Sequence, residues 1–192
     1  MSNQQVEAPL PQWLSTFLDK MTGTTTAPPL ATLKEMAWSW LGSFLGISLV
    51  AILHQFWLSP QDLSLLIGSF GASAVLIYSA ITSPLAQPRN LVGGHLVSGL
   101  VGVAVFQMFG STLWLAAALA VSLAIVAMMA TRTLHPPGGA TALIAVIGSP
   151  ELHNLGYLYA LLPATLGAIL MLLVALIINN IPLNRRYPLY WW

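Results

Sequence analysis

A phrase of small and apolar residues occurs twice in this chain and is the feature best suited to binding a solute. Residues 71–77 read GASAVLI and residues 139–145 read GATALIA, 68 positions apart. The second copy is preceded by the run HPPG at 135–138. A helix start leaves backbone N–H groups without partners and carries a partial positive charge, and small residues let a ligand come close to those groups. The two copies therefore predict two helix starts that hold a small polar or anionic solute.

The candidate binding residues lie at these two starts. They are Phe70, Gly71, Ala72 and Ser73 in the first copy, and His135, Pro136, Pro137, Gly138, Gly139, Ala140 and Thr141 in the second. Ser73 and Thr141 each supply a hydroxyl, and Phe70 could wall the site or belong to the core. The proline pair lacks N–H groups and fixes an extended approach to the second helix. Two such starts facing each other would suit a small anion without a buried arginine.

The structural alternative is that the small residues of the repeated phrase only allow helices to pack closely. Small residues in membrane helices often form packing surfaces, and short matches in apolar sequence can arise by chance. Against chance, residues 92–109 and about 160–177 also match at the same offset. This second match favours a real internal repeat.

Composition predicts an integral, multi-pass membrane protein. Charged residues make up 6% of the 192 residues and hydrophobic residues 57%, with a mean hydropathy of +0.80, whereas about a quarter of a soluble domain is charged. No basic run indicates a nucleic-acid partner. The absence of cysteine excludes disulfides, thiolate chemistry and cysteine metal sites. We expect neither a metal nor another cofactor.

The charged residues divide the chain into six apolar segments. These are approximately 37–57, 63–82, 92–109, 112–131, 138–149 and 159–180. Since about 20 apolar residues cross the ~30 Å hydrocarbon layer, four segments should span it as full helices. The second is full length but interrupted at Gly68–Gly71. The fifth, with about 12 residues, makes only about 18 Å of helix.

The positive charges favour six crossings over four. If all six segments cross, the basic residues share one side, which the positive-inside rule makes cytoplasmic: Lys20, Lys34, Arg89, Arg132, Arg185 and Arg186. Asp62 and Glu151 then lie opposite. If the second and fifth segments only re-enter, Arg89 and Arg132 move outside. The rule therefore predicts that both termini are cytoplasmic.

These elements together predict an all-α membrane protein made of two inverted three-segment repeats, about 37–109 and 112–180, whose central segments are broken or half helices. Such repeats are a transporter architecture. Residues 1–35 form an N-terminal cytoplasmic segment, in which Trp13, Phe17 and their neighbours predict a short amphipathic helix on the membrane surface. Residues 36–182 form the transmembrane domain and 183–192 an aromatic, basic tail.

The run HPPGGATA at 135–142 strongly resembles the HPP family of integral membrane proteins. Further matching stretches are GSFGASA at 68–74, SPLAQPRN at 83–90 and GGHL at 93–96, and the resemblance covers about 36–180. It implies a nitrite transporter of the plastid or cyanobacterial type, in a bacterial or cyanobacterial plasma membrane. The family is often described with four spanning helices, which conflicts with the six crossings that the charges favour. Nitrite suits the predicted site, although nitrate, formate or chloride could also fit.

Several polar side chains have both a functional and a structural interpretation. His135 could be a pH-dependent cation or a partner in proton coupling, or a brace for the unwound segment. His95 could line the path, but a packed histidine is the commoner case. Arg89 and Arg132 could attract anions or anchor the topology. Asn90, together with Gln87, could hold the loop before the third segment.

Two other function classes compete with anion transport. An intramembrane enzyme lacks support, because no acidic residue lies inside a span and no pair of histidines has metal-ligand spacing on one helix; we expect that the protein is not an enzyme. An intramembrane scaffold or interaction subunit would leave the Pro-Pro-Gly-Gly break unexplained. The remaining aromatic residues, including Tyr159 and 187–192, predict an interfacial belt. Because so small a domain has a thin wall around any central site, we expect a homo-oligomer, most simply a dimer.

Overall fold

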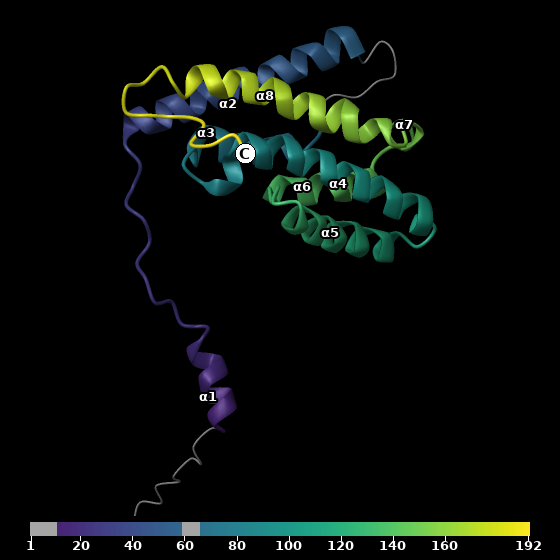
Figure 1. The fold of residues 1–192 in the computed structure, drawn as a ribbon, viewed down its shortest axis with the longest axis horizontal. Helices are drawn as coiled ribbons and strands as arrows, with labels where there is room; N and C mark the ends of the chain where they lie inside the picture. Colours follow the sequence, from purple (N-terminus) through teal and green to yellow (C-terminus); the bar gives the residue numbers. More distant parts are fainter. Residues whose placement is uncertain (1–10, 59–65) are drawn as a thin grey trace, which may run out of the picture. The chain divides into compact units, whose positions relative to one another are not determined.

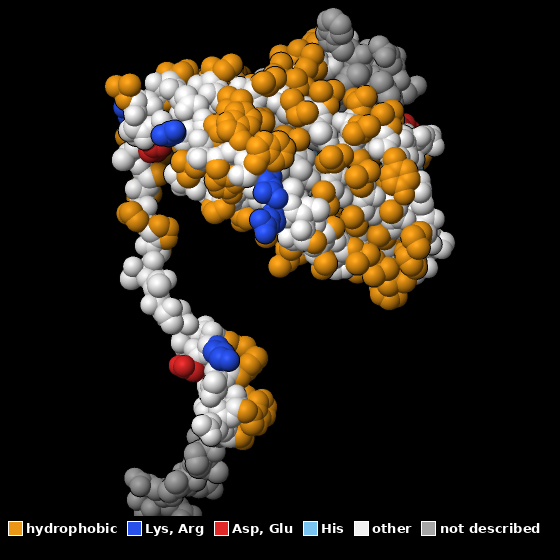
Figure 2. All heavy atoms as spheres, viewed as in Figure 1, with side chains coloured by type: hydrophobic (Ala, Val, Ile, Leu, Met, Phe, Trp, Pro, Cys, Tyr) orange, Lys and Arg blue, Asp and Glu red, His pale blue; other side chains and the backbone are white. Residues whose placement is uncertain are grey.

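The computed structural model describes residues 11–58 and 66–192, and every regular element within them is helical. The chain divides into two compact units, residues 1–31 and 32–192. The first contains α1 (Gln12–Asp19), whose hydrophobic side chains gather on one face (Figure 2). Trp13 is 71% exposed and Phe17 52% exposed. This is the predicted amphipathic helix; its place on a membrane surface stays a prediction.

Among the described residues of the second unit, four helices are long and apolar enough to cross a membrane. They are α2 (Leu33–Leu53), continued by the π-helical η1 (His54–Leu58); α4 (Pro88–Phe109); α5 (Leu113–Ala130); and α8 (Leu166–Ile178), which follows the π-helical η4 (Ala160–Thr165). Hydrophobic side chains cover much of the visible face of this unit (Figure 2), as a surface in contact with lipid requires. The four predicted spanning helices are therefore confirmed.

The two central segments are short helices. The second segment forms α3 (Ser69–Ser79) and the fifth forms α6 (Pro136–Ile147). The prediction of an interrupted second segment with a half helix starting near Gly71 agrees with α3, which begins at Ser69 and has 11 residues; the part of that segment at 63–65 lies outside the described residues. At 1.5 Å per residue, α3 and α6 are about 16 and 18 Å long, so each covers only part of a bilayer.

Two helices begin at a proline, a few residues before their predicted starts. The α4 helix begins at Pro88 rather than 92, and α6 begins at Pro136 rather than 138. Proline suits the first turn of a helix, since that position needs no N–H partner and the fixed φ is already helical. The sequence SPLAQ before α4 forms a short 3-10 helix, η3 (Pro84–Ala86), and α7 (Pro150–Asn154) follows α6.

The two short helices run side by side in opposite directions. Ser69 at the start of α3 lies 2.9 Å from Thr141, between their hydroxyl oxygens, and Ser73 Oγ lies 2.9 Å from Nε2 of His135. Because the residue number rises along α3 while it falls along α6, the helices are antiparallel and their first two turns overlap. Figure 1 shows α6 beside α4.

The C-terminal tail fastens one end of the bundle. Arg185 is buried, pairs with Glu35 at the start of α2 (Nε–Oε2, 3.0 Å) and donates to the Tyr78 carbonyl near the end of α3 (3.0 Å). Tyr187 donates its hydroxyl to the Ala86 carbonyl at 2.7 Å, and burial raises the pKa of this phenol, which keeps it a donor. The start of α2, the end of α3 and the loop before α4 are thus joined.

The basic residues of this unit share that end. Lys34 and Arg185 lie there, and Arg89 joins the start of α4 to the end of α5 by donating to the Thr131 carbonyl at 2.9 Å. Glu151 lies in α7, which follows the other end of α6. This grouping is the one that six crossings predict. Lys20 belongs to the separate N-terminal unit, and the membrane side of each end stays a prediction.

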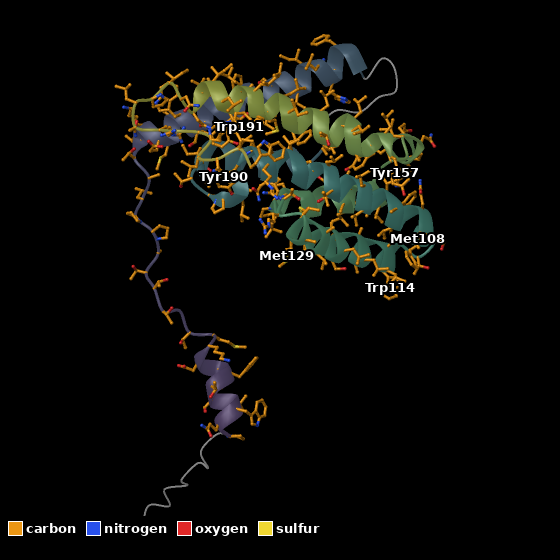
Figure 3. The ribbon with its side chains drawn as sticks, viewed as in Figure 1. Met108, Trp114, Met129, Tyr157, Tyr190 and Trp191 are labelled. Carbon is orange, nitrogen blue, oxygen red and sulfur yellow. The ribbon has the colours of Figure 1, made fainter. Side chains whose placement is uncertain are left out.

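Figure 3 shows Trp114 and Tyr157 toward one end of the second unit. Tyr190 bonds to the Pro84 carbonyl and Trp191 lies beside Pro88, both close to the start of α4. The position of these residues at a membrane interface stays a prediction. Two members of the predicted interfacial belt were assigned wrongly. Tyr159 and Tyr187 are 1% and 2% exposed, because their hydroxyls bond to backbone carbonyls inside the protein.

Substitution of Gly46 by alanine should destabilise the protein. A Cβ there would overlap the Tyr78 hydroxyl oxygen, and moving this ring breaks its bond to the Met171 carbonyl. We expect a cost of about 1–3 kcal/mol, measured as a lower melting temperature in detergent. Gly71→Ala in α3, where a Cβ meets nothing within 4 Å, is the matched control. Equal melting temperatures for both variants would contradict this packing.

Single cysteines on this cysteine-free background should report the arrangement of the ends. Thr131→Cys and Arg186→Cys should be shielded from an impermeant thiol reagent added outside intact cells, whereas Glu151→Cys should be labelled. The reason is that the basic end should remain cytoplasmic. Labelling Thr131→Cys and Glu151→Cys from the same side would show that α6 does not complete a crossing.

Candidate functional site

Five polar side chains meet inside the second unit. Four belong to helices and one to the residue immediately before a helix. The five are Ser69 and Ser73 of α3, His95 of α4, His135 immediately before α6, and Thr141 of α6; we call them the polar cluster. Each is 0% exposed. Full burial of five polar groups is costly unless they bond to one another, and here they do.

The bonds of the polar cluster form one continuous path. From Ser69, the path runs to Thr141 (2.9 Å) and then to Nδ1 of His95 (2.7 Å). The other ring nitrogen of His95 lies 2.8 Å from Ser73 Oγ, which is also 2.9 Å from Nε2 of His135. The path ends where Nδ1 of His135 meets the Leu85 carbonyl at 2.8 Å.

When both histidines are neutral, the carbonyl at the end of this path fixes the direction of the hydrogen bonds between His135 and Thr141. A carbonyl only accepts, so Nδ1 of His135 carries its proton and Nε2 must accept from the Ser73 hydroxyl. Because the single proton of the Ser73 hydroxyl is used in the bond to His135, Ser73 accepts from Nε2 of His95. Nδ1 of His95 then accepts from the Thr141 hydroxyl. The Leu85 carbonyl therefore sets the direction of each bond from His135 to Thr141.

Apolar and backbone groups close the site around the polar cluster. The ring of Phe70 meets His95 edge-on with centroids 5.3 Å apart. Phe70 in turn packs so closely on α8 that a Cβ on Gly167 would overlap its ring. Tyr159, just before η4, donates its hydroxyl to the Thr141 carbonyl at 2.8 Å. The cluster is therefore closed to water in this structure.

The start of α6 does not supply the expected backbone donors. Its first two positions, Pro136 and Pro137, have no N–H, and the N–H of Gly138 donates to the His135 carbonyl at 2.8 Å. In α3, the N–H groups of Phe70 and Gly71 are likewise taken, by the carbonyls of residues 67 and 68. The expectation of free N–H groups at two facing helix ends was therefore wrong. Side-chain hydroxyls and imidazoles are the donors here.

The predicted glycines divide into two kinds. A Cβ on Gly138 would lie 2.6 Å from Ser98 Oγ and 2.8 Å from Met128 Sδ, so this glycine allows α6 to pack on α4 and α5. Gly71 and Gly139 face more open space, where a Cβ would meet no atom nearer than 3.8 Å. Ala72 and Pro136 are exposed, and Ala140 is half-buried. These residues line the membrane-facing side and not the polar cluster.

The polar residues of the loops serve as braces. Asn90 donates to the Leu134 carbonyl at 2.8 Å, which holds the segment before His135. Gln87 donates to the carbonyls of Ile81 and Ser83, both at 2.9 Å. The expected loop-holding role of Asn90 and Gln87 is thus visible. Arg132 is exposed and has a positive φ of 57° just after α5, so it forms part of the turn and not of the cluster.

Three groups at the site had no place in the prediction. Ser69 begins α3 and extends the polar cluster, the Leu85 carbonyl ends it, and Tyr159 closes it. Ser69 lies within the stretch 68–74 that carries the family resemblance, so that stretch was a usable signal. A backbone carbonyl and a tyrosine near a predicted helix end give no comparable signal. The described residues contain no group of three or more His, Asp or Glu that could hold a metal ion.

Thr141→Val should destabilise the protein without changing its shape much. The substitution removes the hydroxyl between Ser69 and His95 and leaves buried polar atoms without a partner, which costs about 1–3 kcal/mol. Ser122→Ala is the control, because Ser122 is exposed and its hydroxyl bonds within its own helix, to the Leu119 carbonyl. We expect a clearly lower melting temperature for the first variant only. Similar values for the two would show that the buried hydroxyl is not needed for stability.

Comparison with known proteins agrees with the membrane architecture. A family model described as the HPP transmembrane region matches residues 28–188. A transmembrane protein of Dictyostelium discoideum is 49% identical over 180 residues, which are 92% of this chain and 57% of the relative. Another from the same organism is 45% identical over 184 residues, which are 94% of this chain and 62% of that relative.

The chain spans about three-fifths of the length of these curated relatives. No solved structure matches it. The family match includes all four long helices, both short helices and every residue of the polar cluster. The chain is therefore a multi-pass integral membrane protein and belongs to the HPP family.

Proposed function

We propose that this protein transports a small inorganic anion across the membrane, with nitrite as the favoured substrate. The observation that carries the proposal is the pair of antiparallel short helices that hold the buried polar cluster between them. Short helices with ends inside the membrane, at the contact between two repeats, are where secondary transporters bind their solutes. Membership of the HPP family supports a transporter-like role.

The chemistry of the polar cluster favours an anion over a cation. Its side chains are hydroxyls and imidazoles, which can turn donors toward a ligand, and it contains no carboxylate. Nitrite is a flat monoanion with an acceptor oxygen at each end, so it can take hydrogen bonds from two sides. Ser73 and Thr141 lie on opposite sides of the His95 ring, at 2.8 and 2.7 Å from its two nitrogens. An anion that displaced this ring would meet donors on both short helices.

The packing of the helices supports two inverted repeats. The first proposed repeat contains α2, α3 and α4, and the second contains α5, α6 and α8. In the first repeat, α2 packs on the short helix α3 and on α8 of the second repeat. In the second repeat, α5 packs in the same way on the short helix α6 and on α4 of the first repeat. Combined with the opposite directions of α3 and α6, this packing supports the inverted architecture. The cytoplasmic placement of both termini, which rests on the positive-inside rule, remains part of the proposal.

The structure represents a closed state of this proposed transporter. Because the polar cluster is fully buried, a solute reaches it only when α3 and α6 separate from their neighbours. Such opening makes the protein a transporter with alternating access and not a permanently open pore. A homodimer with one path in each protomer remains part of the proposal.

Uptake into proteoliposomes tests this function directly. Protein-containing vesicles should take up nitrite faster than protein-free vesicles, and nitrate, formate and chloride measured in parallel define selectivity. Ser73→Ala and Thr141→Val should each lower the protein-dependent rate by about tenfold or more, since a lost hydrogen bond to a charged group costs roughly 1.5–3 kcal/mol.

Ser122→Ala is the matched control for this test. Its hydroxyl bonds only within α5, to the Leu119 carbonyl, and is exposed; we expect the wild-type rate. If folded wild-type protein moves none of the four anions, anion transport is refuted and a scaffold role becomes the better account. If Ser122→Ala loses as much activity as Ser73→Ala, the polar cluster is not the binding site.

A further inference from the structure

We propose that His95, Ser73 and His135 carry one proton with each transported anion, so that the protein is a symporter of a proton and a monovalent anion. The inference rests on the proposed function and adds the coupling ion to it. The geometry that carries it is the bridge of one serine hydroxyl between two buried imidazoles.

The polar cluster can accept one additional proton without losing a hydrogen bond. A second proton on His95 places an N–H at Nδ1, which then donates to Thr141. The Thr141 hydroxyl has two other acceptors within reach, Ser69 Oγ at 2.9 Å and the Pro137 carbonyl at 3.3 Å. The bond between His95 and Thr141 reverses its direction, and the Thr141 proton turns to one of these two acceptors. The same heavy-atom positions therefore fit both proton counts.

The added proton can also move between the two histidines. When Nε2 of His95 gives its proton to Ser73, the serine passes its own proton to Nε2 of His135, over contacts of 2.8 and 2.9 Å. His135 keeps its bond to the Leu85 carbonyl throughout. One N–H bond breaks and another forms, so the positive charge moves from α4 to the start of α6. A hydroxyl between two imidazoles is the simplest side-chain relay that does this.

Within the described part of the chain, no other charged group near the polar cluster balances this proton. Tyr159 bonds to the Thr141 carbonyl, and Tyr78 of α3 bonds to the Met171 carbonyl. Arg89 at the start of α4 is occupied by Thr131, and Glu35 of α2 pairs with Arg185. The helices α5, α6 and α8 carry no Asp, Glu, Lys, Arg or Tyr.

An unbalanced charge inside the membrane is costly. The proton and the anion therefore enter together, each as the counterion of the other. For a monovalent anion, the transported pair has no net charge. Net transport should then follow the pH gradient and ignore the membrane potential.

The experiment uses wild-type protein in proteoliposomes with nitrite as the probe. Exchange of isotopically labelled nitrite, with equal pH and equal nitrite on both sides, reports transport without net proton movement. Net uptake is then compared under an alkaline interior and under an interior-positive potential of about 59 mV, which would favour a single moving negative charge by about tenfold. Protein-free vesicles at the same pH give the passive leak of nitrous acid, which is subtracted.

A symporter should show exchange, faster net uptake with an alkaline interior, one proton entering per nitrite, and no response to the potential. Exchange combined with uptake that follows the potential and not the pH gradient would overturn the symport proposal while leaving anion transport intact. Absence of exchange would refute anion transport itself, and the symport proposal with it.

His135→Gln tests the relay, because glutamine keeps hydrogen-bonding capacity but cannot hold the added proton. Exchange should fall, and the uptake that remains should lose its stimulation by the pH gradient and respond to the potential. Ser73→Ala, which removes the bridge, should change this ratio in the same direction. His153→Gln, at a stacked histidine near the other end of α4, and Ser122→Ala should keep the wild-type ratio. Unchanged coupling in both relay variants would exclude these residues as the proton carriers.

Discussion

The structure depends on one constraint: a helix that begins inside a membrane must satisfy its polar groups without water. Both α3 and α6 are too short to cross a bilayer, and their first turns lie side by side within the bundle. Each short helix contributes a hydroxyl to the path through His95, and the His135 ring bonds to both Ser73 and the Leu85 carbonyl. The polar cluster thus joins the two short helices and also brings acid–base chemistry to their contact.

The rest of the bundle keeps this polar cluster dry. Glycines let helices approach closely: a Cβ on Gly94 would lie 2.5 Å from His135 Cβ, and one on Gly99 would lie 2.8 Å from Ala160 Cα. The C-terminal tail acts on the loop that ends the path, since Tyr187 bonds to Ala86, the residue next to Leu85. A displacement of the tail would therefore shift the Leu85 carbonyl, to which the His135 ring is hydrogen-bonded. This connection joins the basic end of the bundle to its buried centre.

Sequence patterns predicted the architecture well because the bilayer imposes simple rules. Length and hydropathy are enough to identify a spanning helix, so the four long helices were found. The run HPPGGATA and the phrase GASAVLI identified both short helices, and the scarcity of charge placed the basic residues at one end. Boundaries were less accurate: Pro88 and Pro136 begin helices that were predicted to start at 92 and 138, and the pair Pro136-Pro137 was interpreted as an extended approach to α6. Tyr159 was assigned to the membrane interface because sequence does not tell whether a hydroxyl meets water or a carbonyl.

The sequence by itself determined that this is a membrane protein with two short central helices, because composition and local helix chemistry depend only on neighbouring residues. Only the tertiary structure decided which groups these helices present to each other. Ser73 and His135 are 62 positions apart, and His95 and Thr141 are 46 apart; no local pattern specifies such pairings. Pro136 and Pro137 have no N–H group, which the sequence already shows. That the N–H of the next residue, Gly138, donates to the His135 carbonyl was visible only in the tertiary structure. The repeated phrase predicted a site made of backbone N–H groups, whereas the groups that meet in the structure are the side chains of the polar cluster.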